Sequence, residues 1–361
     1  MGQAIMCGTD VHDKMLVSRV SVGLGEPETM KHRNTSDGRR ELFGVLKRLK
    51  RENEAERMIM AYEASGQGFG LHDQAEAAGI ECRVLPPTRV GRKGREHKNK
   101  NDVRDAQMLL GSLRAHVLAG NDLPVVWIPD HELRRDRELV RMRLDVGEKM
   151  TEVRTQIRCL LKRHEILKPE KAGETWSAAY CKWIESLRPE GGIGMALASL
   201  LRQLCFLEEE QKDLDKLVAT LAKADRYREP AKALLKLQGV GILTTMVFLT
   251  EIGDMSRFNN RKKLGAYLGL VPTCHESGDF DNKKGHITKE GPSRVRKLLC
   301  QAAWSSINGH GPDEPVFQSI VERNPGRKKI AVVAIMRRLA IRMWHIALDA
   351  QQRSASRQKA A

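Results

Sequence analysis

Four acidic residues in the first third of the sequence have the types and spacing for divalent-metal chemistry. Asp10 stands near the end of one apolar segment, and Glu63 directly follows another. Asp102 and Asp105 are three residues apart, a spacing that places two carboxylates on one face of a helix. Mg²⁺ prefers oxygen ligands, and two such ions about 4 Å apart can activate an attacking oxygen and neutralise a leaving oxygen at a phosphodiester. The four residues therefore predict a metal site whose cofactors are two Mg²⁺ ions.

Each of these acidic residues also has a structural interpretation when it is considered alone. Asp10 could be a turn residue, and Asp102 could cap a helix that carries Asp105 in its first turn. The joint placement of the four residues on separate elements favours the metal site. His12 follows Asp10 by two residues, but no other histidine stands at ligand spacing. A turn or a phosphate contact is therefore favoured for His12 over metal binding.

Basic residues form a second group that suits phosphate chemistry. Residues 89–104 contain seven Lys or Arg against two acidic residues, and they lead directly into the segment of Asp102. The whole chain has 62 Lys and Arg against 46 Asp and Glu, and its formal net charge of +16 attracts polyanions. Such a run is often only a solvated loop, but its position beside the carboxylates favours nucleic-acid contact. The predicted nucleic-acid-binding residues are Arg92, Lys93, Arg95, Lys98, Lys283, Lys284, Lys289, Arg294 and Arg296.

Two further features lie in the C-terminal half. Residues 234–254 contain a Gly-Val-Gly turn between two apolar segments, which predicts either a helix-hairpin-helix-like element that binds phosphate or a simple corner between helices. Ser277 precedes Gly278 and a basic loop. A Ser-Gly pair outside a G-x-S-x-G context usually forms a turn. Spacing alone therefore makes Ser277 a weak candidate for a nucleophile.

The elements that must position the acidic residues follow the order of an α/β fold. Short apolar segments bounded by turn residues predict the strands, and helical spacing of apolar residues predicts the helices between them. Ser36 is predicted to cap the first helix. The strands are expected at 3–8, 15–22, 29–34, 57–62 and 80–85. Three strands followed by alternating helices and strands is the order of the ribonuclease-H-like (RuvC-like) fold.

The rest of the chain is predicted to be mainly α-helical. Segments 131–168 and 194–223 interleave charged and apolar residues at helical spacing, so each predicts a long helix with a solvated face or a face that pairs with another chain. A compact segment, 231–307, precedes a basic helix at 328–349 and a frayed tail. The expected domains are 1–125 (RuvC-like), 126–230 (helical linker), 231–350 (mainly helical) and 351–361 (flexible tail).

Composition limits the class of protein. The chain has 361 residues, 41% of them hydrophobic, which is enough for one large core or two ordinary ones. No apolar run approaches the roughly 20 residues that span a bilayer, and the first residues lack a signal-peptide core. Seven scattered cysteines form no C-x-x-C pair. A reduced, cytoplasmic protein without a zinc module or a membrane partner is therefore expected.

Three short motifs and one long segment resemble a known family. The motifs GTDVHDK (8–14), AYEASG (61–66) and KNDVRDA (100–106) are similar to the acidic motifs of insertion-sequence transposases that have a RuvC-like DEDD domain. Residues 238–304 resemble the C-terminal transposase domain of the same family. Asp13 departs from the pattern, because many relatives have the basic residue directly after the position of His12.

This resemblance implies a function and roles for residues. Asp10, Glu63, Asp102 and Asp105 would be the metal tetrad, and Ser277 would be the catalytic serine. The chain would be a DNA transposase or recombinase that excises and inserts a mobile element. Its partners would be DNA, a structured guide RNA (a bridge RNA) and further copies of the chain. Two alternatives stay open, namely a metal-dependent junction or RNA nuclease that uses water, and a DNA-binding protein without enzymatic activity.

Overall fold

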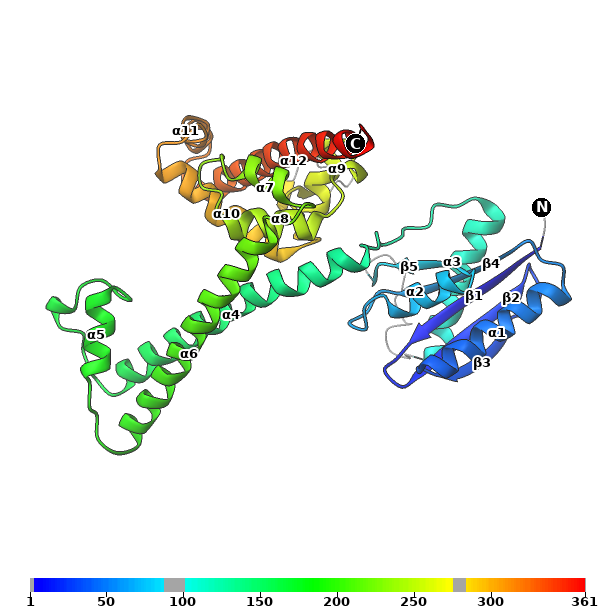
Figure 1. The fold of residues 1–361 in the computed structure, drawn as a ribbon, viewed down its shortest axis with the longest axis horizontal. Coiled ribbons are helices and arrows are strands. Elements are labelled where there is room, and N and C mark those ends of the chain that lie inside the picture. The colour runs from blue at the N-terminus through cyan, green and yellow to red at the C-terminus, as the bar shows by residue number, and fades with distance from the viewer. Residues whose placement is uncertain (1–2, 88–100, 275–283, 361) are drawn as a thin grey trace. The chain divides into compact units, whose positions relative to one another are not determined.

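A five-stranded mixed sheet is the centre of the N-terminal unit, residues 1–128, in the computed structural model, which describes residues 3–87, 101–274 and 284–360 (Figure 1). The sheet order is β3-β2-β1-β4-β5, with β1 antiparallel to β2 and parallel to β4. The strands are β1 (Ala4–Val11), β2 (Met15–Val22), β3 (Glu28–Arg33), β4 (Arg57–Glu63) and β5 (Glu81–Leu85). A mixed sheet with helices is consistent with the expected ribonuclease-H-like fold.

Helices cover both faces of this sheet. One core cluster joins Ile5 and Met60 of the sheet to α1 (Ser36–Glu52) and α2 (Gly70–Ala77). On the opposite face, a second cluster joins the central strands to α3 (Asp102–Ala119). Central strands that are buried on both faces have continuous apolar sequences, which is why these strands were recognisable.

Two helix caps differ from the sequence prediction. Thr35, not Ser36, caps α1, and its side-chain oxygen accepts a hydrogen bond from the Gly38 amide at 3.2 Å. Asn101 caps α3 by accepting from the Val103 amide at 3.0 Å, so the interpretation of Asp102 as the cap is wrong. A cap needs extended backbone, and only the structure shows which residue has it. The carboxylate of Asp102 is therefore not used for capping.

Two long helices begin the second unit, residues 129–361. α4 (His131–Arg163) and α6 (Gly191–Leu221) pack against each other through a cluster that includes Ile157 and Leu204. The two predicted long helices are confirmed, with slightly different ends. The short helix α5 (Ala178–Ser186) lies in the connection between them and adds Tyr180 to the same cluster.

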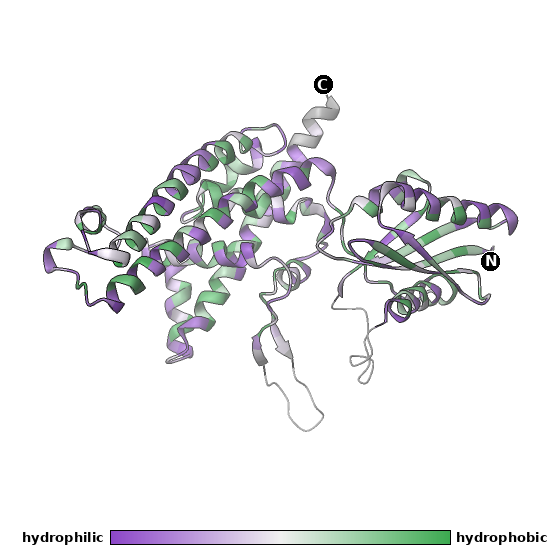
Figure 2. Ribbon diagram, turned by 90° about the horizontal axis from the view of Figure 1, so that it is seen from below, coloured by the Kyte–Doolittle hydropathy of each residue, from purple (hydrophilic) through white to green (hydrophobic). Residues whose placement is uncertain are grey.

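The remaining helices of this unit share one large core. Hydrophobic and hydrophilic residues alternate along them (Figure 2). The helices are α7 (Arg228–Leu234), α8 (Ile242–Ile252), α9 (Arg261–Tyr267), α10 (Ser293–Asn308), α11 (Glu314–Arg323) and α12 (Lys328–Ala360). A two-stranded sheet, β6 (Pro272–Cys274) and β7 (Lys284–Ile287), precedes α10. The basic C-terminal helix continues to Ala360, so the prediction that it ends near 349 is wrong, whereas the flexibility of residues 351–361 stays a prediction. Among the described helices, none has the length and apolarity that crossing a bilayer requires.

The Gly-Val-Gly turn lies between α7 and α8 and packs on α10. Gly239 has φ +80°, and a Cβ there would lie 2.5 Å from the carbonyl oxygen of Ala302 and 3.0 Å from the amide nitrogen of Ser306. Glycine is therefore required by both backbone conformation and space. A corner between two helices is present, whereas its use as a phosphate-binding hairpin remains a prediction.

Candidate metal centre and nucleic-acid interface

Three side chains converge where β1 ends. Asp10 is the second-last residue of β1, and His12 follows in the turn to β2. Asp102 is the first residue of α3. His12 Nε2 lies 3.0 Å from Asp10 Oδ2 and 3.2 Å from Asp102 Oδ1. One ligand atom from each residue lies within 4.8 Å of the others, so the three can reach a common metal ion. The chemistry of this donor set fits a divalent cation.

Close packing of α3 on β1 brings these residues together. A Cβ at Gly8 would lie 2.3 Å from the amide nitrogen of Leu110 and 2.4 Å from the carbonyl oxygen of Ala106. The backbone of α3 therefore lies directly against β1 at this glycine. Asp10 is two residues farther along the strand and points to the same face of the sheet as Gly8. It thus faces the first turn of α3, which carries Asp102 and Asp105.

The register of the sheet places Glu63 near the same position. β1 and β4 are parallel, and Thr9 pairs with Tyr62, so Asp10 and Glu63 occupy the next positions on neighbouring strands. Ile59 and Ala61 of β4 belong to the core under α3, and alternation along the strand directs Glu63 to that face as well. The four predicted carboxylates therefore belong to the sheet face that α3 covers. Their joint coordination of metal remains a prediction.

Electrostatics at Asp10 favour a bound cation. Burial raises the pKa of the Asp10 carboxyl above its usual value, His12 opposes this shift, and Asp105 and Asp102 add to it. Half-buried carboxylates that repel one another destabilise their ionised forms unless a positive charge lies among them. A divalent ion would supply that charge and reverse the effect on the pKa.

His12 is the site residue to which the sequence interpretation assigned a different role. A turn or phosphate contact was favoured, and His12 does lie in the turn from β1 to β2, but the structure also places its imidazole between two of the predicted ligands. A signal was present in the sequence: residues two apart on extended backbone point to the same side, so Asp10 and His12 could have been paired. The carboxylate of Asp102, which completes the contact, comes from a segment too far along the chain for local periodicity to reveal.

Several other predicted residues lie outside the part of the chain that the structure describes. These are Ser277, Arg92, Lys93, Arg95, Lys98 and Lys283. Lys284 begins β7, and Lys289 is exposed. Their roles stay predictions.

Two predicted nucleic-acid-binding arginines have contacts within the protein. Arg294 pairs with Asp145 of α4 at 3.0 Å. Arg296 donates hydrogen bonds to the carbonyl oxygens of Leu268, Glu290 and Gly291, and burial lowers the pKa of its guanidinium. Arg296 therefore helps to hold the loop before α10, in addition to any contact with nucleic acid.

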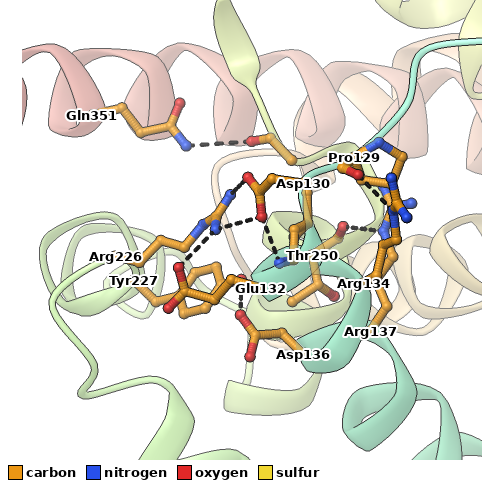
Figure 3. A network of polar contacts seen from close by, with 12 residues as sticks. Pro129, Asp130, Glu132, Arg134, Asp136, Arg137, Arg226, Tyr227, Thr250 and Gln351 are labelled. Carbon is orange, nitrogen blue, oxygen red and sulfur yellow. Dashed lines mark hydrogen bonds and ion pairs between the residues drawn. The ribbon is translucent and has the colours of Figure 1, made fainter. Parts of the chain in front are cut away.

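A polar network at the start of α4 is structural (Figure 3). Asp130 caps α4 by accepting from the Leu133 amide at 2.7 Å, and Arg226 lies 2.6 Å from its other oxygen. The hydrogen bond from Arg226 lowers the pKa of Asp130 to about 2. Nearby, Arg137 donates to the carbonyl oxygen of Thr250 at 2.7 Å. These contacts attach α4 to the segment before α7 and to the end of α8.

Comparison with known families supports the class that the fold and the acidic cluster indicate. Residues 7–166 match a DEDD-type model described as a transposase of the IS110 type, and residues 231–317 match the model of the transposase IS116/IS110/IS902 family. The first of these matches gives the class of the chain, a DEDD-type transposase. The chain belongs to the IS110/IS116/IS902 family of that class.

Individual relatives agree with this assignment. A Sinorhizobium fredii protein whose name provisionally calls it a transposase is 31% identical over 253 residues, which are 69% of this chain and 59% of the relative. The transposase for insertion sequence element IS1533 from Leptospira borgpetersenii is 25% identical over 353 residues, 95% of each chain. The pilin gene-inverting protein of Moraxella bovis is 34% identical over 109 residues, 30% of this chain and 34% of the relative. The match therefore spans less than two thirds of the first relative and almost all of the second.

Proposed function

We propose that this protein excises and inserts a mobile DNA element, and that Asp10, Glu63, Asp102 and Asp105 hold two Mg²⁺ ions at the scissile phosphate. The observation that carries this proposal is the approach of Asp10 to Asp102 on the sheet face that α3 covers. Mg²⁺ ions at these carboxylates would neutralise charge on the phosphate and on the leaving oxygen. The name of the IS1533 relative, a transposase for an insertion sequence element, supports DNA as the substrate.

Ser277 is the proposed nucleophile. Its hydroxyl oxygen attacks the phosphorus and loses its proton to solvent, while the bond from phosphorus to a deoxyribose oxygen breaks and that oxygen takes a proton from solvent to leave as a hydroxyl. The resulting phosphoserine keeps the energy of the phosphodiester, so the reverse attack by a deoxyribose hydroxyl rejoins DNA and releases the serine. Support comes from the position of Ser277 inside residues 231–317, which match the transposase family model.

A guide RNA and further copies of the chain are proposed partners. The formal net charge of +16 supports binding to nucleic acid, because basic surfaces release counterions from phosphate backbones. Base pairing of the RNA to donor and target DNA would supply sequence recognition, while the protein contacts mainly phosphates. The family resemblance of the acidic motifs and of residues 238–304 supports both partners.

A covalent adduct tests the serine mechanism. The protein, its guide RNA and element-end DNA are incubated with Mg²⁺ and then denatured, and a protein–DNA adduct is expected by gel electrophoresis. Ser277→Ala should abolish the adduct while nucleic-acid binding persists, and Asp102→Ala should abolish it as well. Ser293→Ala and Thr273→Ala are controls from the same segment that should retain the adduct. Cleavage by Ser277→Ala at the parent rate would overturn the serine mechanism, and free DNA ends without an adduct would favour a nuclease that uses water.

A further inference from the structure

Hydrogen bonds hold the backbone of His12 at the candidate metal centre. The His12 amide donates to the carbonyl oxygen of Met15 at 2.9 Å, and the His12 carbonyl oxygen accepts from Asn34 Nδ2 at 2.7 Å. Asn34 Nδ2 also donates to Gln67 Oε1 at 2.8 Å. The backbone of His12 is thus held from two sides, and its side chain is 38% exposed. The imidazole therefore reaches the carboxylates from a constrained turn.

The geometry around Nε2 suits an octahedral ion. Adjacent ligands of an octahedral divalent ion with bonds of about 2.1 Å lie about 3 Å apart. His12 Nε2 lies 3.0 Å from Asp10 Oδ2 and 3.2 Å from Asp102 Oδ1. Neutral imidazole is a common metal ligand through this nitrogen. Each of the two oxygens therefore lies from Nε2 at the separation of adjacent ligands, and all three donor atoms lie within 4.8 Å of one another.

We propose that His12 is a third ligand, through Nε2, of the cation that Asp10 and Asp102 hold, and that this nitrogen makes the site bind Mn²⁺ more tightly than Mg²⁺. This inference rests on the proposed metal centre and names a ligand beyond its four carboxylates. Imidazole nitrogen binds transition-metal ions better than it binds Mg²⁺, which keeps oxygen ligands. Mixed nitrogen and oxygen coordination thus gives the site a preference that carboxylates alone do not give.

A protonated imidazole that only donates hydrogen bonds to both carboxylates would have similar distances. In that arrangement His12 would lower the metal affinity of the site, because a positive charge at Nε2 competes with a metal ion for the same oxygens. Removal of a ligand weakens metal binding, whereas removal of a competing charge strengthens it. The sign of the change in affinity therefore distinguishes the two arrangements.

Pulsed electron paramagnetic resonance with Mn²⁺ tests the proposal without an activity assay. The full-length protein with less than one equivalent of Mn²⁺ should show ¹⁴N coupling from a directly bound imidazole. His12→Ala should lose this coupling, and its Mn²⁺ affinity by calorimetry should fall about tenfold or more, while Mg²⁺ affinity changes by less than about twofold. His12→Gln, which retains hydrogen bonding, should lose the coupling too. His116→Ala, at the other end of α3, is the matched control and should retain both the coupling and the affinity.

Three results would overturn the proposal. The first is Mn²⁺ bound to the parent protein without ¹⁴N coupling, and the second is equal or tighter Mn²⁺ binding by His12→Ala or His12→Gln. The third is no Mn²⁺ binding at all. The adduct assay distinguishes failure of the His12 proposal from failure of the proposed function. The adduct is expected to depend on Ser277, Asp102 and Mg²⁺ whether or not His12 is a ligand.

Discussion

At the scale of single residues, Gly8 sets the approach of α3 to the sheet. Gly8→Ala places a Cβ 2.3 Å from the Leu110 amide nitrogen, a backbone atom that can move only with the whole helix. We expect the free energy of unfolding to fall by about 1–3 kcal/mol. Metal affinity should fall as well, because α3 carries Asp102. Gly111→Ala on the same helix meets nothing within 4 Å and should be neutral or stabilise by up to about 1 kcal/mol. Urea unfolding and Mn²⁺ titration measure both effects; equal stability of the two variants would contradict the close packing.

The ion pair between Asp130 and Arg226 predicts a pH dependence of stability. Hydrogen bonding to Arg226 lowers the pKa of Asp130 to about 2, below the value of about 4 that an unfolded chain has. The stabilisation is therefore present above about pH 4 and is lost as the pH falls through about 2. Because the pair is partly exposed, it should contribute no more than about 1 kcal/mol.

Asp130→Asn isolates this charge, since asparagine can still cap α4. The melting temperature of the variant should lie below that of the parent at pH 6, and the two should converge toward pH 2.5. Asp225→Asn removes a more exposed pair with Arg228 and serves as the control, with little change at either pH. A difference for Asp130→Asn that is independent of pH would assign the effect to packing instead of charge.

At the scale of elements, the cap of α3 links folding to the metal centre. Asn101→Ala removes the acceptor of the Val103 amide, which should cost about 1 kcal/mol and loosen the helical turn that carries Asp102 and Asp105. Mn²⁺ affinity should therefore fall severalfold, and Asn101→Ser should restore it. Thr35→Ala removes the cap of α1 and should lower stability by a similar amount without changing Mn²⁺ affinity. Equal losses of metal affinity in the two alanine variants would contradict a local role for the α3 cap.

At the scale of the whole molecule, positive charge should dominate binding to nucleic acid. Each phosphate contact contributes about 0.9 to the slope of log affinity against log salt for duplex DNA. Replacing three basic residues that contact phosphates should flatten this slope by about 2–3. The variant carries alanine at Arg92, Lys93 and Arg95.

A control variant with the same loss of charge makes this experiment specific. Alanine at Lys47, Arg48 and Arg51 of α1 removes three positive charges from a different part of the chain. Its slope should stay within about 1 of the parent value. Equal slopes for the parent and the 92, 93 and 95 variant would place those residues in a solvated loop. Fluorescence anisotropy between 50 and about 300 mM salt supplies the measurement.

Much of the local structure was determined by the sequence itself. Short apolar segments bounded by turn residues and apolar residues at helical spacing are local patterns, so the five strands and the long helices could be predicted. The apolar segments placed Asp10 and Glu63 at strand ends, and helical spacing placed Asp102 and Asp105 on one helix face. Errors at element ends include the caps at Thr35 and Asn101 and the length of α12, since adjacent polar residues have similar capping ability. The short strands β6 and β7 were not predicted.

Only the tertiary structure decided which distant side chains meet. The position of His12 between Asp10 and Asp102 depends on the sheet order and on the contact of α3 with Gly8. The backbone contacts of Arg296 likewise require that α10 packs beside the loop before it. Local periodicity shows which face of its own element a residue occupies. Distances between elements depend on packing among segments that are far apart in sequence, and local sequence patterns do not contain that information.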